Sequence, residues 1–468
     1  MSDHKRQKQQ QKVWREESRK RRKQLHIPES VQWGSYCLDF PTFDNPGIIE
    51  LQNFIRELDN EAEWAQSRRE IIADFMRSLH ASKSPLEMIT LVPSIFPASN
   101  GDMILLDSAQ DLYDCLGKTF NKPLLHRTSM SGKSLCGRKL SLDMFWAYLH
   151  EQSNKAIDVY DYSVAEHSSR TRRMTVQEVL LHWKLPGHER HAINLLDIEN
   201  RIGDFCPTEV IQHDLSCKIS RSFATNVGKT NSEWMNNRRE FFLLSGANAI
   251  SSIHVDNGAQ LTWISILEGR KIWYFPRKIT SESVRLLALA GSQGPQGYEE
   301  GWARVELCPG DLLIMPPSCP HAVFTPDGCL AVGGHFYTSA HLGSTLRGLK
   351  LQEDYPEICN EDLQPDFYNL LEIIFQNLGS INSYTQKADI LSSLPLFLNT
   401  FDGASLATLF RNRRGSNFRC DKHQLSRVME QLELRIASQD SRLISSRVTF
   451  IDALERLQKQ LLENWEDE

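Results

Sequence analysis

Hydrophobic residues recur at helical spacing toward both ends of the chain. Between 46 and 82 they lie three or four residues apart, after a capping Asn45 and a Pro46 suited to a first helical turn: Ile48, Leu51, Ile55, Leu58, Ile71, Phe75, Met76 and Leu79. Near the other end a second stripe follows the same spacing: Ile444, Val448, Ile451, Leu454, Leu457 and Leu461. Such stripes are more often packing faces than binding sites, so flanking helices are expected at both ends. A self-association helix is the alternative for the second stripe.

Between about residue 120 and residue 340 the pattern changes to short apolar or β-branched runs. Gly, Pro, Asn or Asp often separates these runs, as between strands. The runs cover 156–160, 192–196, 241–244, 262–267, 272–275, 305–307, 312–315 and 330–332. Several short strands with turn signals predict a β-sandwich or barrel rather than a doubly wound sheet.

These patterns divide the chain into four regions. We expect a disordered basic tail over 1–30, a mostly helical flanking region over 31–118, the β domain over 119–345 and a C-terminal helical domain over 346–468. Glycines at 291, 294 and 297 fall in a less regular segment, 280–302. This segment is expected to be either a lid that faces the substrate or a surface insertion.

Composition narrows the class of protein. Hydrophobic residues make up 40% of the chain and charged residues 24%, as in soluble globular proteins. No apolar run approaches the roughly 20 residues of a membrane helix, and the charged N-terminus lacks the apolar core of a secretion signal. None of the ten cysteines forms a CxxC pair, which argues against zinc fingers and favours reduced thiols in a cytosolic or nuclear protein.

The basic residues are concentrated in the N-terminal tail. Residues 4–24 hold ten Lys and Arg against two Glu, although the net charge of the whole chain is −6. The two clusters, at 5–6 and 19–23, resemble a two-part nuclear localisation signal. A solvated tail or a weak nucleic-acid contact is the alternative. We expect a nuclear protein, or otherwise a cytosolic one, with no membrane partner.

Two motifs carry candidate metal ligands. In IHVDNG, His254 and Asp256 are two residues apart, so on a strand they project from one face. In GDLLIMPPSCPHAV, His321 follows a buried strand and a loop stiffened by prolines. A neighbouring antiparallel strand would place its imidazole beside the pair. Two histidines and one carboxylate on one side of an ion suit non-haem Fe(II), because three positions stay open for a bidentate cosubstrate and O₂.

Two further residues suit an anionic cosubstrate. Lys271 enters an apolar strand, where a lysine is costly unless an anion pairs with it. The distal carboxylate of 2-oxoglutarate would be such an anion, and Ser251 could donate a second hydrogen bond to it. Taken singly, His254 fits a hydrogen-bonded core histidine and Lys271 fits an exposed hairpin residue. Their ordered occurrence on predicted strands favours the metal site.

The sequence over 253–275, together with 310–336, resembles the core of JmjC oxygenases, and 157–183 resembles the entry to that domain. The similarity covers about 120–340 and is most marked to the histone lysine demethylase branch. It implies a double-stranded β-helix, a cupin-like jelly roll. It also implies Fe(II) at His254, Asp256 and His321, and 2-oxoglutarate at Lys271 and Ser251.

The sequence departs from that branch at two positions near the expected substrate pocket. His335 stands in GGHF where the demethylases usually have an asparagine, and Ile264 stands where an aromatic residue is frequent. Both changes leave the iron and cosubstrate set intact.

The resemblance implies a dioxygenase that hydroxylates N-methyl groups of lysine and releases formaldehyde. The expected substrate is a histone tail or another chromatin protein. Two alternatives stay open. One is a JmjC hydroxylase of protein side chains, and the other is a chromatin-binding protein whose barrel does not turn over.

Overall fold

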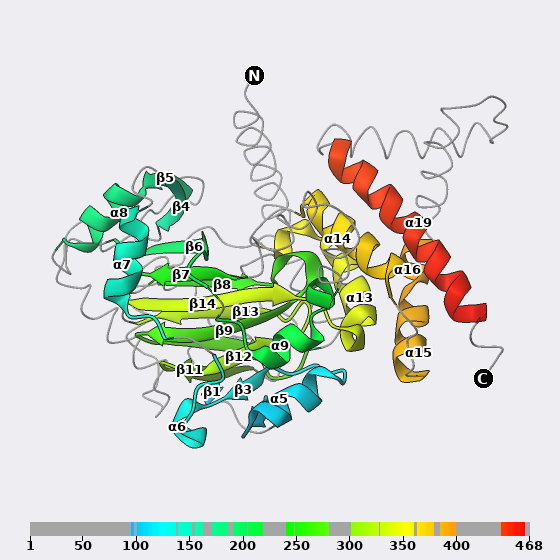
Figure 1. The fold of residues 1–468 in the computed structure, drawn as a ribbon, viewed down its shortest axis with the longest axis horizontal. Helices are drawn as coiled ribbons and strands as arrows, with labels where there is room; N and C mark the ends of the chain where they lie inside the picture. The colour runs from blue at the N-terminus through cyan, green and yellow to red at the C-terminus, as the bar shows by residue number, and fades with distance from the viewer. Residues whose placement is uncertain are drawn as a thin grey trace, which may run out of the picture.

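The computed structural model of the chain describes most of the region from 95 to 398 and one helix near the C-terminus (Figure 1). The described residues are 95–97, 101–136, 139–151, 155–161, 171–185, 191–203, 205–218, 240–247, 249–279, 301–326, 328–359, 363–378, 384–398 and 441–463. The predicted tail over 1–30, the predicted helices over 46–82 and nearly all of the segment 280–302 lie outside them.

Two sheets form the centre of the structure. The larger has nine strands in the order β2 (Ile104–Leu106), β3 (Leu124–His126), β12 (Leu312–Met315), β9 (Leu261–Glu268), β14 (Cys329–Phe336), β7 (Phe241–Ser245), β6 (Ile193–Glu199), β4 (Ala156–Asp161) and β5 (Thr171–Thr175). The smaller has five in the order β1 (Ile95–Pro97), β11 (Trp302–Leu307), β10 (Lys271–Pro276), β13 (His321–Thr325) and β8 (Ala249–His254). Most neighbouring strands are antiparallel, and the predicted jelly-roll core is confirmed.

Side chains alternate between the two faces of each strand, and the two faces have different partners. On β9, Ile264 and Ile266 point toward the smaller sheet and pack with Trp273 and Phe275 in a cluster contributed by both sheets. Trp263 points the other way. The side chains between the sheets define what we call the barrel interior.

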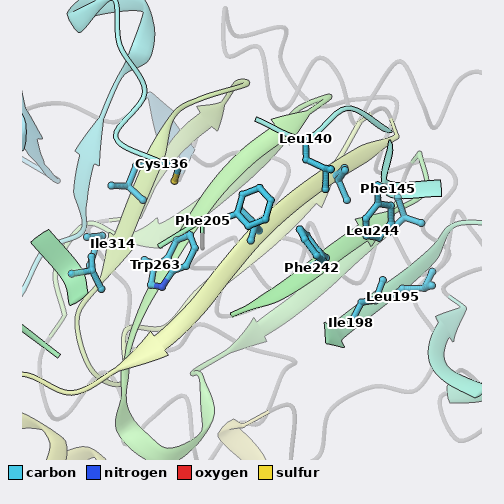
Figure 2. Close-up of a cluster of buried hydrophobic side chains, with 14 of the residues drawn as sticks. Cys136, Leu140, Phe145, Leu195, Ile198, Phe205, Phe242, Leu244, Trp263 and Ile314 are labelled. Atoms are coloured by element: carbon cyan, nitrogen blue, oxygen red, sulfur yellow. The ribbon is translucent and has the colours of Figure 1, made fainter. Parts of the chain in front are cut away.

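Helices cover the outer face of the larger sheet. Figure 2 shows part of this outer core, in which Trp263, Phe242 and Ile314 of the sheet meet Phe145 and Phe205. The covering helices are α5 (Ala109–Leu116), α7 (Leu142–Glu151), α8 (Val176–Trp183) and α9 (Thr208–His213), whereas the short α6 (Thr128–Ser131) buries no residue. Burial of each large apolar side chain stabilises the fold by about 1.5–3 kcal/mol, so this layer fixes the larger sheet in place.

The C-terminal helices pack against one end of the two sheets (Figure 1). They are α13 (Leu342–Asp354), α14 (Pro365–Gln376), α15 (Tyr384–Ser393), α16 (Pro395–Leu398) and α19 (Ser441–Glu463), with short 3-10 turns η6 (Ser339–His341) and η7 (Pro356–Ile358). Their core includes Ile451, Leu454, Leu457 and Leu461, which confirms packing for this part of the predicted stripe. The division near residue 345 stays a prediction. None of the described helices is both long and apolar enough to cross a membrane.

Candidate metal centre

Strand pairing brings the two candidate histidines together. His254 is the last residue of β8 and His321 is the first of β13, and the antiparallel register places them directly opposite each other. Their ring centroids are 4.3 Å apart. Two histidines that lie 67 residues apart in the sequence therefore occupy one pair of facing positions.

Asp256 completes the cluster from the turn that follows β8. It precedes the short 3-10 turn η4 (Asn257–Ala259) and has extended backbone angles. Its Oδ1 lies 3.8 Å from Nε2 of His254 and 3.7 Å from Nε2 of His321. The three donor atoms all lie within 4.8 Å of one another, and among the described residues this is the only such group of His, Cys, Asp or Glu.

Hydrogen bonds on the far side of each ring leave both Nε2 atoms available. Nδ1 of His254 lies 2.7 Å from the Ser252 carbonyl oxygen, and Nδ1 of His321 lies 3.0 Å from that of Cys319. A carbonyl oxygen only accepts, so each Nδ1 carries a proton and each Nε2 is left to face Asp256. Burial, followed by the neighbouring His321, lowers the pKa of His254 to about 4. His254 is therefore neutral near pH 7, as a metal ligand must be.

The second carboxylate oxygen of Asp256 is held separately. The hydroxyl of Thr262 donates to Oδ2 at 2.5 Å, and Nδ1 of His335 lies 3.0 Å from the same hydroxyl oxygen. Burial alone raises the pKa of Asp256, but His321, His335, His254 and the Thr262 hydroxyl outweigh it, so the pKa is lowered. The carboxylate stays ionised with Oδ1 facing the imidazoles.

This donor set fits Fe(II). Two imidazoles and one carboxylate oxygen approach a common point from one side, and the separations of 3.7 and 3.8 Å let a single ion contact all three. Hydrogen bonds that fix each ligand from behind are typical of metal sites in proteins. The prediction that His254, Asp256 and His321 lie together is thus met by the geometry.

Lys271 lies on the interior face of the smaller sheet. It lies on the same face of β10 as Trp273 and Phe275, which belong to the interior core. The ring of Phe275 is 6.4 Å from that of His321. The residue is only 3% exposed, its Nζ lies 6.0 Å from the centre of the Trp273 ring, and burial lowers its pKa. Within the described chain no carboxylate forms an ion pair with it. The exposed-hairpin alternative is wrong for this lysine.

Ser251 reaches the same interior through an irregularity in β8. An odd spacing from His254 would put the two residues on opposite faces of a regular strand. However, four residues of β8, from Ser251 to His254, face three residues of β13, from His321 to Val323. Such a bulge turns both side chains to one face. Asn194 of the larger sheet donates to Ser251 Oγ at 3.5 Å, which places Ser251 between the sheets.

The two residues expected near the substrate pocket differ in their contacts. Ile264 is buried in the interior core, and its side chain occupies the space that a Cβ at Gly333 would need. His335 packs against Phe241, with ring centroids 5.1 Å apart, and is joined to Asp256 through Thr262. His335 therefore belongs to the surroundings of the metal cluster, whereas Ile264 forms part of the apolar wall.

Sequence reasoning missed Thr262 and Asn194. Thr262 lies on the same face of β9 as Ile264, so strand alternation could have placed it in the interior. Asn194 is a buried polar residue on β6, bonded to Ser245 Oγ at 2.5 Å as well as to Ser251. No local motif marks it.

Comparison with known proteins finds relatives that are described as histone or lysine demethylases. The chain is 26% identical over 211 residues to histone lysine demethylase PHF8 of Danio rerio, which covers 43% of this chain and 19% of that protein. It is 25% identical over 208 residues to lysine-specific demethylase 7A of Mus musculus, or 43% and 21% of the two chains. It is 30% identical over 141 residues to JmjC domain-containing histone demethylation protein 1 of Candida albicans, or 27% and 28%.

The matched segments span less than a third of each of these relatives. No family model matches the chain. The jelly-roll core, the clustered His-Asp-His group and the relatives agree with one another. Over this region the chain is thus similar to JmjC proteins, most of all to the histone lysine demethylase branch of that family.

Proposed function

We propose that the protein is an Fe(II)- and 2-oxoglutarate-dependent dioxygenase that demethylates methyl-lysine on histones. The observation that carries the proposal is the convergence of His254, Asp256 and His321 beside an interior that also holds the buried ammonium group of Lys271, which pairs with no carboxylate among the described residues. Metal ligands alone would suit many reactions. A buried cation on the same interior adds the requirement for an anionic cosubstrate.

Each residue has a defined task in this proposal. The three ligands hold Fe(II), which with 2-oxoglutarate and O₂ supplies the oxidising power for hydroxylation of a C–H bond. Lys271 pairs with the distal carboxylate of 2-oxoglutarate, and Ser251 donates a hydrogen bond to it. Asn194 orients Ser251. The apolar walls, including Ile264 and Phe275, exclude water from the site.

The overall reaction balances without a nucleophilic side chain. One oxygen atom of O₂ enters succinate as 2-oxoglutarate loses CO₂, and the other is inserted into a C–H bond of the N-methyl group. The hydroxymethyl amine then breaks its C–N bond, which releases formaldehyde and returns a proton to the nitrogen. The protein supplies orientation and a dry site.

Hydroxylation of a protein side chain is the second candidate, and His335 favours it. In this chain the imidazole is bonded to Thr262 beside the metal cluster, where the demethylase branch usually has an asparagine. The same oxidising chemistry on a carbon that is not bonded to nitrogen gives a stable alcohol. A chromatin-binding protein without turnover is disfavoured, because all three ligands and Lys271 are present.

The names of the relatives support a chromatin substrate and a nuclear location. We infer that a histone tail or another chromatin protein is the partner. A contact with nucleic acid through the basic tail at 1–30 belongs to the same proposal and rests on the charge of that tail alone.

The test is product release from a panel of methylated histone peptides. Wild-type protein with Fe(II) and 2-oxoglutarate should release succinate and formaldehyde in equal amounts, and His254→Ala should release neither. His150→Ala, which alters an exposed histidine on α7, is the matched control and should behave as wild type. Succinate with a stable +16 Da peptide and no formaldehyde would establish the hydroxylase instead. Equal succinate release from wild type and His254→Ala would refute the ligand assignment.

A further inference from the structure

The turn that carries Asp256 has an unfavourable backbone. Gly258 has φ 72° and Ala259 has φ 48°, so both residues lie in the left-handed region. For a residue with a Cβ this conformation costs roughly 1–2 kcal/mol. Such a turn persists only where its surroundings hold it, and the contacts that do so come from α13 and from Tyr337, which follows β14.

Gln352 of α13 makes two hydrogen bonds to this turn. Its Nε2 donates to the main-chain oxygen of Asp256 at 3.0 Å, and its Oε1 accepts from the main-chain N–H of Gly258 at 2.9 Å. The side chain is buried, with 2% exposed. One primary amide therefore spans the turn from the ligand residue to the first left-handed residue, and only this orientation of the amide matches a donor and an acceptor to both partners.

Neighbouring contacts extend the attachment. Thr345 of α13 donates to the Ala259 oxygen at 3.0 Å, and Tyr337 donates to the Gly258 oxygen at 2.9 Å. The N–H of Val255 donates to the oxygen of Ile358 at 2.9 Å. Contacts from beyond the barrel thus reach the chain on both sides of Asp256, but within the described residues Gln352 is the side chain that bonds to Asp256 itself from the C-terminal helices.

We propose that Gln352 is a positioning residue of the metal centre. By fixing the main chain of Asp256, it sets the direction in which Oδ1 meets His254 and His321. The inference rests on the proposed role of Asp256 as a ligand. Residues that orient metal ligands typically contribute 10- to 100-fold in affinity, and an orientation imposed through the main chain is expected at the lower end of that range.

The experiment measures metal binding by the full chain without turnover. Mn(II) is titrated by electron paramagnetic resonance, and Co(II) is followed by its d–d absorption, which reports coordination geometry. Gln352→Met keeps the length of the side chain and removes both hydrogen bonds. It should weaken Mn(II) binding about tenfold and alter the Co(II) spectrum. Gln352→Asn keeps the amide but is one methylene shorter, and should show a smaller loss.

The matched control is Gln376→Met, which removes an exposed glutamine of α14 bonded to Glu372. It should leave both readouts at wild-type values. A Gln352→Met protein with a lower melting temperature but unchanged Mn(II) affinity and Co(II) spectrum would overturn the positioning role and leave the proposed function standing. If Gln352→Met does not fold, the same comparison with Gln352→Asn decides. Wild-type protein that binds neither ion would refute the metal centre, and the inference with it.

Discussion

Replacement of Lys271 by methionine should change stability and cosubstrate binding in opposite directions. The lysine is buried at 3% exposure, and no carboxylate forms an ion pair with it in the described part of the chain. The ring of Trp273, 6.0 Å from Nζ, is worth about 2 kcal/mol as a cation–π partner at a desolvated site. An isolated buried charge costs several kcal/mol, so the ring offsets only part of the penalty.

The expected change in stability follows from the cost of the buried charge and the contribution of the Trp273 ring. Methionine has nearly the same length as lysine and fills the space without a charge, so the loss of packing is small. The free energy of unfolding of the ligand-free protein should rise by about 2 kcal/mol, which corresponds to about 2–4 °C in melting temperature. The loss of the partner for a buried carboxylate costs about 3–5 kcal/mol, so the Kd for 2-oxoglutarate should rise by roughly 150- to 5000-fold.

The stability difference should also depend on pH. Burial lowers the pKa of Lys271 in the folded state, so the unfolded chain holds this proton more tightly. Below the folded-state pKa both states carry the proton, and the buried charge destabilises the folded state to its full extent. This destabilisation disappears as pH rises from there to the unfolded value near 10.4. The advantage of Lys271→Met over wild type should therefore shrink as pH approaches 10. Bound 2-oxoglutarate should remove it at pH 7, because the carboxylate pairs with the charge.

Urea unfolding and calorimetric titration with 2-oxoglutarate check both halves of the prediction. Lys133→Met, at an exposed position, is the matched control and should change neither quantity. A Lys271→Met protein that is less stable than wild type at pH 7 without cosubstrate would show that Lys271 has a structural partner and would remove the argument for an anion site.

Three further changes test other parts of the structure. Thr262→Val removes the hydroxyl that holds the ligand carboxylate and should weaken Mn(II) binding 10- to 100-fold by titration; unchanged affinity would contradict this. Trp263→Ala opens a cavity in the outer core (Figure 2) and should cost about 3–5 kcal/mol in urea unfolding; a loss below about 1 kcal/mol would count against the packing described. A Cβ at Gly348 would lie 2.1 Å from Ser318 Oγ and 2.9 Å from Ala259 Cβ, so Gly348→Ala should lower stability by about 1–3 kcal/mol, and an unchanged melting temperature would contradict the close approach of α13.

The strand pattern predicted the core because alternation and turn signals are local. The run over 262–267 corresponds to β9 and the run over 312–315 to β12. These two strands pair as neighbours, which could not be predicted from the sequence. His254 and Asp256 could be paired from their spacing alone. The position of His321 beside them could be predicted only by assuming that its strand pairs with theirs in an antiparallel manner. The structure shows this pairing between β13 and β8.

Contacts that depend on register or on distant segments could not be predicted. The bulge that turns Ser251 to the interior arises from one extra residue in the pairing of β8 with β13, and no residue type marks it. In the sequence Thr262 has the pattern of an ordinary strand residue, and only the fold shows His335 beside it. Gln352 lies 96 residues beyond Asp256 and carries no motif. These residues act through geometry that only the folded chain provides.

The register of the smaller sheet also constrains which anion suits Lys271. Trp273 lies opposite Val323 and Tyr274 opposite Ala322, so the next step along β10 brings Phe275 beside His321. Lys271 is four residues before Phe275, a distance of about 13 Å along a strand. A dicarboxylate that meets the lysine at one end and the ligand cluster at the other suits this separation better than a single carboxylate or phosphate does. The strand register is therefore compatible with the 2-oxoglutarate that the proposed function requires.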